Sequence, residues 1–329
     1  MKIIMMSIGL LSTKFLQFQK RKKEVFYEMA KPYTFLTSNS RDKWKKSKFS
    51  VRSSRSMLGR TWTGFEDKLE DSDMAYLFYN DQSPDEDAGT TTSGFWLVHS
   101  IPKFGRPDKY KYPKNALLNG QIAFCMTFDT AFLSDICNHL LLCHPNIYSS
   151  RLDPKLEEIL DESAKTIFTE KPWFVRKAPF TRKSAIKTLN GRHLRLFAKD
   201  NQLKVDIYHD IIAPNLNISL LVETWQRGSG TVLDPVCESN YNVMDVQAVE
   251  MRMKNRNSTI FFTSTEDHSK WAISLERQPR WVCIADLNRM RSQAKRGGSA
   301  ICFQSKSVWK AFRRIIVDVA SCPDVSYDS

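Results

Sequence analysis

A histidine and a lysine two positions apart, His268 and Lys270, are the side chains of this sequence best suited to chemistry on a phosphate ester. Side chains alternate along an extended strand, so residues i and i+2 project to the same side. An imidazole serves as a nucleophile or proton carrier near neutral pH, and an ammonium group neutralises phosphate charge. A surface His and Lys on an edge strand have the same spacing, so the neighbouring residues must decide between the two readings.

The pair lies in the run Ser-Thr-Glu-Asp-His-Ser-Lys-Trp at residues 264–271. This run resembles the C-terminal active-site motif of the type II acid deoxyribonucleases, the DNase II family. The resemblance covers residues 31–322 in the family's order. It includes further segments at residues 79–82, 94–102, 119–121, 125, 281–283, 286–289, 296–298, 302 and 308–312.

The resemblance implies an α/β fold of the phospholipase D-like kind, with duplicated mixed sheets flanked by helices in two pseudo-symmetric halves. We expect an atypical basic N-terminal arm at residues 1–30, an N-terminal half at 31–185 and a C-terminal half at 186–329. Each half of such a protein contributes one His-x-Lys motif to a central site.

The resemblance also implies a metal-independent acid endodeoxyribonuclease that needs no cofactor and acts on DNA. Carried over residue by residue, His268 is the catalytic histidine and Lys270 its phosphate-binding lysine. Asn288 and His99 are the other candidate catalytic residues, and Asp286 and Asn80 are candidate supporting residues. Two close imidazoles titrate as a coupled pair, which suits an acid optimum without a metal.

The partner His-x-Lys motif is absent. The family carries it between the segments matched here by residues 79–82 and 94–102, yet residues 83–93 contain neither His nor Lys. We therefore expect a loop at residues 80–93 and no strand in that place. Three explanations stay open: this translation lacks a segment; the chain is a catalytically impaired, secreted paralogue that binds nucleic acid or another partner; or a homodimer joins two copies of the motif in one site.

The net charge of +13 points to an anionic partner, but it is concentrated near the N-terminus. Residues 1–60 contain fifteen Lys or Arg against three acidic residues, and the remainder is nearly balanced. We interpret the N-terminal excess as a solvated arm. The apolar run within residues 1–12 is too short to span a membrane, so no transmembrane segment is expected, and it lacks a clear signal-peptide cleavage site.

Seven cysteines and two Asn-x-Ser/Thr sequons, at Asn217 and Asn257, are compatible with a secreted or lysosomal glycoprotein. The resemblance implies the disulfides Cys237–Cys322 and Cys283–Cys302. No cysteine precedes Cys125, whose family counterpart pairs with an N-terminal cysteine.

Apolar composition and periodicity predict the elements that must position these residues. Strands are expected at residues 74–79, 95–98, 122–127, 194–199, 218–225, 260–263, 271–274, 281–285 and 300–303. Helices are expected at residues 129–142, 156–167, 205–212 and 307–320, and a polar crossover at 172–192.

Overall fold

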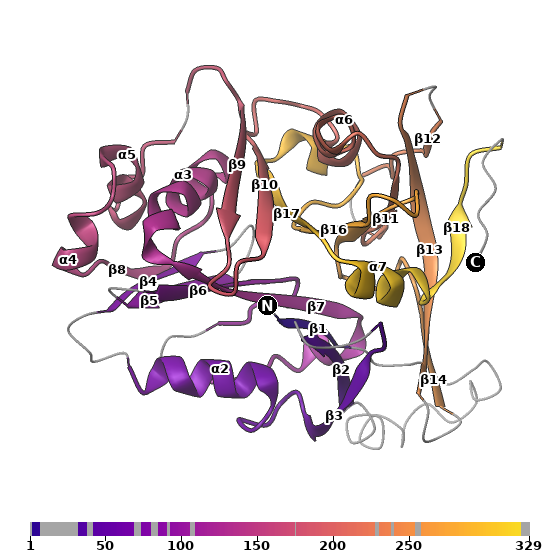
Figure 1. The fold of residues 1–329 in the computed structure, drawn as a ribbon, viewed down its shortest axis with the longest axis horizontal. Coiled ribbons are helices and arrows are strands. Elements are labelled where there is room, and N and C mark those ends of the chain that lie inside the picture. Colours follow the sequence, from indigo (N-terminus) through magenta and orange to yellow (C-terminus); the bar gives the residue numbers. More distant parts are fainter. Residues whose placement is uncertain are drawn as a thin grey trace.

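A computed structural model of the protein describes residues 2–6, 32–37, 42–68, 74–79, 85–90, 93–105, 109–174, 176–227, 230–237, 240–253 and 258–323. Within these residues the strands form two sheets, one of eight strands and one of ten, accompanied by short helices (Figure 1). The α/β class agrees with the expectation from the sequence. The duplicated, phospholipase D-like form of that class stays a prediction.

The eight-stranded sheet is antiparallel throughout. In spatial order its strands are β3 (Lys45–Ser50), β2 (Pro32–Thr37), β1 (Lys2–Met6), β7 (Gln121–Asp129), β6 (Ser93–His99), β5 (Asp85–Thr90), β4 (Met74–Tyr79) and β8 (Ser149–Arg151). Strand β1 pairs with both β2 and β7. The segment expected to be a basic arm therefore begins with a strand of this sheet.

The ten-stranded sheet is mixed, because β11 and β13 run parallel. Its main path is β12 (Val236–Cys237), β13 (Asn242–Met253), β11 (Leu220–Glu223), β15 (Trp271–Ser274), β16 (Trp281–Ala285), β17 (Gly298–Gln304), β10 (His193–Lys199) and β9 (Thr181–Lys187). Strands β14 (Ser258–Thr263) and β18 (Ile316–Ala320) also pair with β13. The expected division after residue 185 falls inside β9, and the domain boundaries stay predictions.

The helices are short, and none in the described part of the chain is long and apolar enough to cross a membrane. They are α2 (Met57–Glu66), α3 (Leu133–Cys143), α4 (Pro154–Glu157), α5 (Glu162–Lys165), the π-helix η4 (Ile207–Ile212), α6 (Ala213–Leu216) and α7 (Lys306–Arg313). Helix α2 starts where Ser56 Oγ accepts a hydrogen bond from the Gly59 backbone N–H at 2.8 Å. It buries Leu58, Trp62 and Phe65, which are spaced for one helix face.

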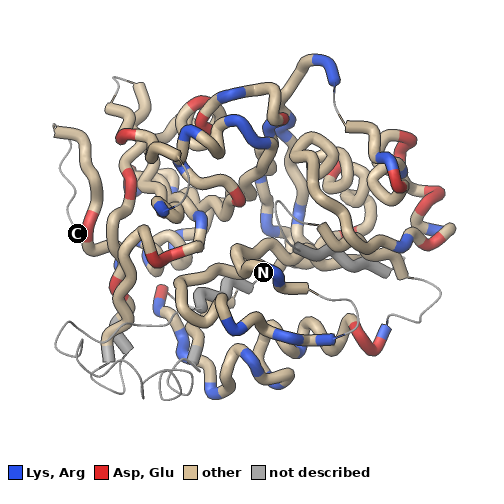
Figure 2. The backbone as a smooth tube through the Cα atoms, turned by 180° about the vertical axis from the view of Figure 1, so that it is seen from behind, with Lys and Arg blue, Asp and Glu red and all other residues tan. Residues whose placement is uncertain are grey.

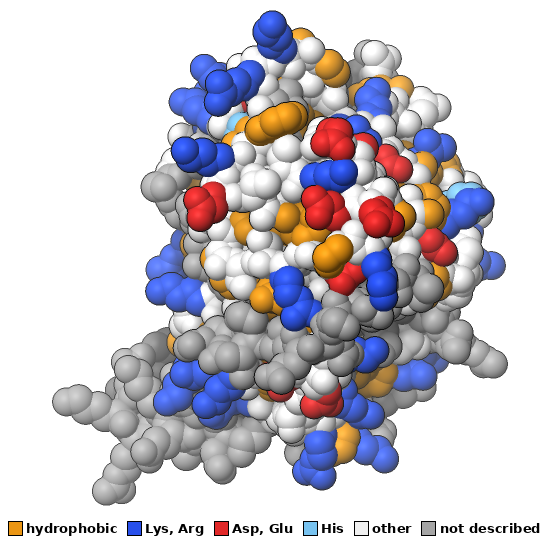
Figure 3. Space-filling model, turned by 90° about the vertical axis from the view of Figure 1, so that its left-hand side faces the viewer, with side chains coloured by type: hydrophobic (Ala, Val, Ile, Leu, Met, Phe, Trp, Pro, Cys, Tyr) orange, Lys and Arg blue, Asp and Glu red, His pale blue; other side chains and the backbone are white. Residues whose placement is uncertain are grey.

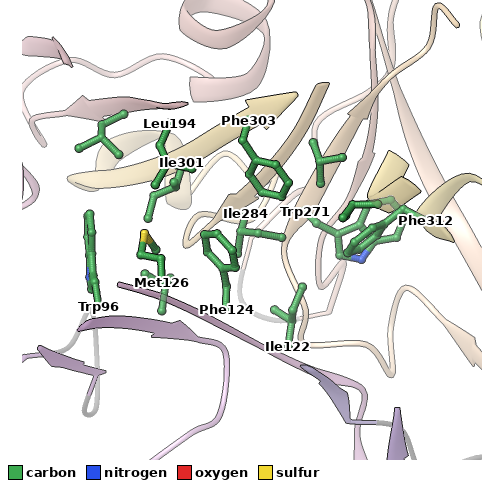
Figure 4. Close-up of a cluster of buried hydrophobic side chains, with 14 of the residues drawn as sticks. Trp96, Ile122, Phe124, Met126, Leu194, Trp271, Ile284, Ile301, Phe303 and Phe312 are labelled. Carbon is green, nitrogen blue, oxygen red and sulfur yellow. The ribbon is translucent and has the colours of Figure 1, made fainter. Parts of the chain in front are cut away.

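One apolar core lies between the two sheets (Figure 4). Phe124 of β7 stacks on Phe303 of β17, with ring centroids 5.6 Å apart. Ile122 and Met126 extend the core along β7, and Ile301 faces them from the ten-stranded sheet. Burial of each such side chain is worth about 1.5–3 kcal/mol, so the core holds the sheets together as one unit.

The strands nearest the proposed chemistry agree with the sequence-based predictions. Strands β4, β15 and β16 have the predicted bounds, and β6, β7, β10, β14 and β17 extend one to three residues beyond theirs. Strand β11 is shorter than the strand predicted at residues 218–225. Both predicted disulfides, Cys237–Cys322 and Cys283–Cys302, are confirmed. Cys283 and Cys302 are direct cross-strand partners in the register of β16 and β17.

The prediction of a strandless loop at residues 80–93 is wrong. Strand β5 occupies this place and pairs with β4 on one side and β6 on the other. Its sequence, Asp-Glu-Asp-Ala-Gly-Thr, has low strand propensity, so pairing on both sides overrides the local preference. The sheet thus retains a strand here, although its sequence contains neither His nor Lys.

The predicted helix at residues 307–320 is also wrong in its second half. Helix α7 ends at Arg313, and Ile316–Ala320 forms β18 beside β13. β-branched residues dominate that segment and favour a strand. Apolar residues of both elements pack into the same core, which is why their spacing resembles a single helix face.

Three other element predictions differ from the structure. The helix predicted at residues 156–167 is broken where the Asp161 side chain accepts from the Ala164 backbone N–H and starts α5 afresh. The segment predicted as a crossover contains β9, which buries only Ile186 and is an edge strand. The helix predicted to stop before Pro214 continues, because proline is tolerated in the first turn of α6.

Charge is unevenly placed on the backbone (Figure 2). Lys and Arg positions recur around β3 and α2 and along β9 and β10, whereas Asp and Glu positions gather around α4 and α5. On the face toward α3–α5, acidic side chains are interspersed with basic ones (Figure 3). The mixed charge there offers no uniform attraction for a polyanion.

Candidate functional site

The two sheets meet at a backbone junction between Gly120 and the segment 266–268. Gly120 N–H donates to the Glu266 carbonyl at 2.9 Å, and His268 N–H donates to the Gly120 carbonyl at 2.9 Å. A Cβ atom at position 120 would lie 2.4 Å from Asp267 Oδ1, so glycine is required for this close approach. The junction places the His-x-Lys segment directly against the start of β7.

His268 is half-buried at this junction, three residues before β15. Its ring packs on the Trp225 indole, with centroids 4.3 Å apart, and Trp225 Nε1 is held by the Thr265 carbonyl at 3.0 Å. Burial, followed by the charge of Lys270, lowers the pKa of the His268 imidazole to about 4. The imidazole is therefore neutral at mildly acidic pH, which is the form that can act as a nucleophile.

Lys270 lies beside this imidazole and continues the β15 ladder. Its carbonyl accepts from the Ala285 N–H at 3.1 Å, which extends the pairing of β15 with β16 by one residue. Its Nζ donates to the His268 carbonyl at 3.0 Å. The ammonium group is thus tied to the backbone of His268, close enough for its charge to contribute to the lowered pKa of the imidazole.

Two buried carboxyl groups lie under the motif, and sequence reasoning assigned neither a role. Asp267 accepts from the Ser269 N–H at 2.8 Å, and burial raises its pKa. Glu223, the last residue of β11, is paired in register with Trp271 and is fully buried. Burial, then the nearby Asp267 and Asp245, raise the pKa of Glu223 well above its ordinary value, so this side chain is a neutral acid at mildly acidic pH.

Neither carboxyl oxygen of Glu223 has a hydrogen-bond partner among the described residues. The only sequence feature that points to Glu223 is its place at the end of an apolar run. Its position beside the His-x-Lys motif follows from the register of β11 and β15.

The loop after β16 holds Asp286 and Asn288, the two candidates predicted from the C-terminal segment. The Asp286 carboxylate accepts from the Ser299 N–H at 2.7 and 2.9 Å and from its hydroxyl at 3.1 Å. These bonds tie the loop to β17. Asn288 Oδ1 is buried and has no hydrogen-bond partner within the described residues.

Arg289 anchors the same loop from beneath. This fully buried guanidinium donates to Asp206 at 2.8 Å, to Asp245, and to the Asp234 carbonyl at 3.0 Å. Each of the three guanidinium nitrogens donates one of these bonds, which offsets part of the cost of burying the charge. The position of Asn288 is therefore fixed from both sides.

The eight-stranded sheet contributes His99 and Gln121 near the junction. His99 ends β6 opposite Ala123, and its Nδ1 accepts from the Ile101 N–H at 3.1 Å. Gln121, which follows Gly120, is fully buried, and its Oε1 accepts from Ser100 Oγ at 2.8 Å. His99 therefore lies on the strand next to β7, opposite a residue three positions after Gly120, and its ring packs against Phe104 with centroids 5.2 Å apart.

The remaining predicted positions are less informative. Asn80 and the sequon Asn257 lie outside the described residues. Asn217 is exposed at the end of α6, and its Oδ1 accepts from the Tyr241 hydroxyl at 2.9 Å. No cluster of three or more His, Cys, Asp or Glu side chains arranged to hold a metal ion occurs in the part of the chain that the structure describes.

Most of the chain is similar to proteins of one family. The family model described as Deoxyribonuclease II matches residues 15–322. Deoxyribonuclease-2 of Caenorhabditis elegans is 40% identical over 221 residues, covering 67% of this chain but only 56% of that relative. Deoxyribonuclease-2-beta of Mus musculus is 31% identical over 323 residues, and that of Homo sapiens is 32% identical over 326. Each of these two matches covers 94% of this chain and 88% of the relative.

Proposed function

The chain belongs to the deoxyribonuclease II family, and we propose that it is an endonuclease that hydrolyses DNA phosphodiesters with His268 as its nucleophile. The observation that carries this proposal is the junction itself. A half-buried imidazole of lowered pKa and an ammonium group lie where the ends of two sheets meet. A neutral imidazole beside an ammonium group at such a junction suits attack on a phosphate ester better than most other functions.

In the proposed reaction, neutral His268 attacks phosphorus. A P–N bond forms as the P–O bond to the leaving oxygen breaks, and the leaving oxygen takes up a proton. Water then cleaves the P–N bond and restores the imidazole. Lys270 and the Asn288 amide stabilise the charged phosphoryl oxygens, while Asp286 acts through the loop it braces. None of these steps requires a metal ion or another cofactor.

The leaving oxygen needs a proton donor, and His99 is our candidate because of its position beside residues 121–123. A general acid typically contributes about 10²–10⁴ in rate. Since no second His-x-Lys motif is present in the sequence around β5, we expect slow cleavage. A binding protein that retains DNA without cutting it is the second candidate, and the same observation favours it. A homodimer that shares two His268–Lys270 pairs is a third arrangement to test.

The test is nicking of supercoiled plasmid at acid pH in the presence of EDTA. We expect the wild type to nick and His268→Ala to lose at least about a hundredfold in rate. His209→Ala is the matched control, because this histidine lies on η4 and pairs with its neighbour Asp210. DNA retention in a gel shift without nicking by the wild type would establish the binding function instead. Sedimentation of the active species decides between a monomer and a dimer.

We further propose a lysosomal or secreted location and glycosylation of Asn217 and Asn257. Two disulfides support this, because such bonds persist in oxidising compartments. Asn217 is also exposed, as an acceptor must be. A mobility shift upon deglycosylation, lost in Asn217→Gln or Asn257→Gln, would identify the modified sites.

A further inference from the structure

A groove unrelated to the His268 junction lies on the outer face of the ten-stranded sheet. Two cavities, of about 700 and about 320 Å³, share Ala185, Arg195 and Trp281 and so form one continuous hollow. Leu194 and Leu196 of β10 point into the core between the sheets, and Arg195 alternates to the opposite side. We call this hollow the outer groove; the side chains that matter are Lys183, Ala185, Arg192, His193, Arg195 and Trp281.

The strand register explains why the face is hollow there. Ala185, Arg195, Cys302 and Cys283 are successive cross-strand partners from β9 to β16. Apart from the arginine, this row consists of an alanine and the Cys283–Cys302 disulfide, both of small volume. Helices η4 and α6 cover the neighbouring part of the same face, where Phe197 and Ala300 are buried against them. Ala185 lines both cavities, whereas Cys283 and Cys302 are fully buried in the covered cluster, so the open depression lies over the β9–β10 end of this row.

The charge in the groove is of one sign. Lys183, Arg192 and Arg195 line it together with His193, and no carboxylate among the described residues lines either cavity. Lys183, His193 and Arg195 are exposed. Arg192 is fixed by a hydrogen bond from its Nη1 to the Gln304 carbonyl at 2.9 Å. Uncompensated positive charge in a concave site attracts anions.

Trp281 supplies an aromatic surface within this positive field. Its indole lines both cavities, and its backbone N–H is held by Ser274 Oγ at 3.1 Å. Basic side chains that follow a phosphate backbone, combined with an aromatic ring on which a base stacks, are the means by which proteins hold single-stranded nucleic acid. A combined volume in the range of ordinary ligand pockets suits a short segment of one strand.

We propose that the outer groove binds a single-stranded segment of DNA, with a base on Trp281 and phosphates on Arg195, Arg192 and Lys183. The inference rests on the proposed function for its choice of DNA as the ligand. The groove is nevertheless separate from the catalytic junction: Trp281 begins β16, whereas Ala285, which contacts Lys270, ends it about 13 Å further along. Frayed or partly degraded DNA would be retained there while another phosphate occupies the junction.

The experiment uses the full chain carrying His268→Ala, so that bound DNA is not cut, and a fluorescein-labelled thymidine oligonucleotide. Arg195→Ala is expected to reduce the slope of log affinity against log salt concentration by about 0.7, one phosphate contact on a single strand. Trp281→Ala is expected to weaken binding at least about fivefold. Lys155→Ala on α4 is the matched control for loss of one exposed positive charge, and its affinity should not change.

Circular dichroism and thermal unfolding establish that each variant is folded. Arg195→Lys provides a second test that keeps the charge, and it should restore the salt slope. Equal losses in Arg195→Ala and Lys155→Ala, or unchanged binding in Arg195→Ala and Trp281→Ala, overturn the proposal. Oligonucleotide binding that depends on the groove without any plasmid nicking by the wild type would refute only the nuclease function. Nicking by the wild type with groove-independent binding would refute only the groove.

Discussion

Replacing Glu223 by glutamine tests whether a buried neutral acid lies behind the His-x-Lys motif. Glu223 is fully buried at the end of β11, and burial raises its pKa well above the model-compound value of 4.5. Glutamine has nearly the shape of the protonated acid but cannot ionise. The substitution therefore removes one titration while leaving the packing almost unchanged.

The size of the effect follows from proton linkage. Above pH 4.5 the unfolded chain ionises Glu223, whereas the folded protein keeps it protonated until the raised pKa is reached. The folded state then binds about one more proton, so the free energy of unfolding falls as pH rises, by about 1.4 kcal/mol for each pH unit. This stabilisation is complete below pH 4.5 and is lost as pH rises through the raised pKa. Over the pH range in which the folded protein keeps Glu223 protonated, the wild type should lose stability through this group at that slope, and Glu223→Gln should not.

The assay is urea unfolding under non-reducing conditions at half-unit intervals between pH 4.5 and 7, with the two proteins compared at each pH. Asp245, whose pKa burial raises to about 6, and Asp267 contribute losses of the same sign to both proteins, so the difference between them isolates Glu223. Glu157→Gln, an exposed position on α4, is the matched control and should follow the wild type. Parallel loss of stability in wild type and Glu223→Gln would refute the reasoning, because it would mean that Glu223 ionises equally in the folded and unfolded states.

Two further predictions concern the His-x-Lys motif and the disulfide between β16 and β17. Lys270→Met should raise the pKa of His268, because the Lys270 charge contributes to the lowering of that pKa. NMR titration of the imidazole should show the midpoint moving upward from about 4. An unchanged midpoint would contradict the assigned cause. The double variant Cys283→Ser, Cys302→Ser should lose about 3 kcal/mol of stability, the loop-closure value for residues 19 apart, as measured by urea unfolding. A loss below about 1 kcal/mol would show that the reduced chain is already constrained in this region.

The sequence predicted the central strands well because their signals are local. Trp271–Ser274 and Trp281–Ala285 are apolar segments bounded by polar or turn residues, and their structural bounds match the predicted ones. The predictions that failed concern segments whose secondary structure depends on pairing with other strands. Asp85–Thr90 becomes a strand through pairing on both sides, and Ile316–Ala320 through pairing with β13, and neither interaction can be read from the segment alone.

The candidate site divides in the same way. His268 and Lys270 were identified from their own motif, and the structure places them at the junction of the sheets. Glu223 comes from a distant part of the chain and occurs in an ordinary sequence context, whereas Gln121 lies in the segment 119–121, which resembles the family but was assigned no role. Their relevance depends on the β11–β15 register and on the contact of Gly120 with Asp267, which are long-range features of the fold.

The apolar interior shared by the two sheets restricts how a polymer can enter. A pair of lobes joined by a flexible connection could swing apart around a passing duplex, but lobes fused through Phe124, Phe303 and their neighbours cannot separate without exposing that interior to water. The two sheets therefore stay together as one rigid body when a ligand binds. If the proposed function holds, the DNA, and not the protein, bends or frays to bring a backbone linkage to the His268 imidazole.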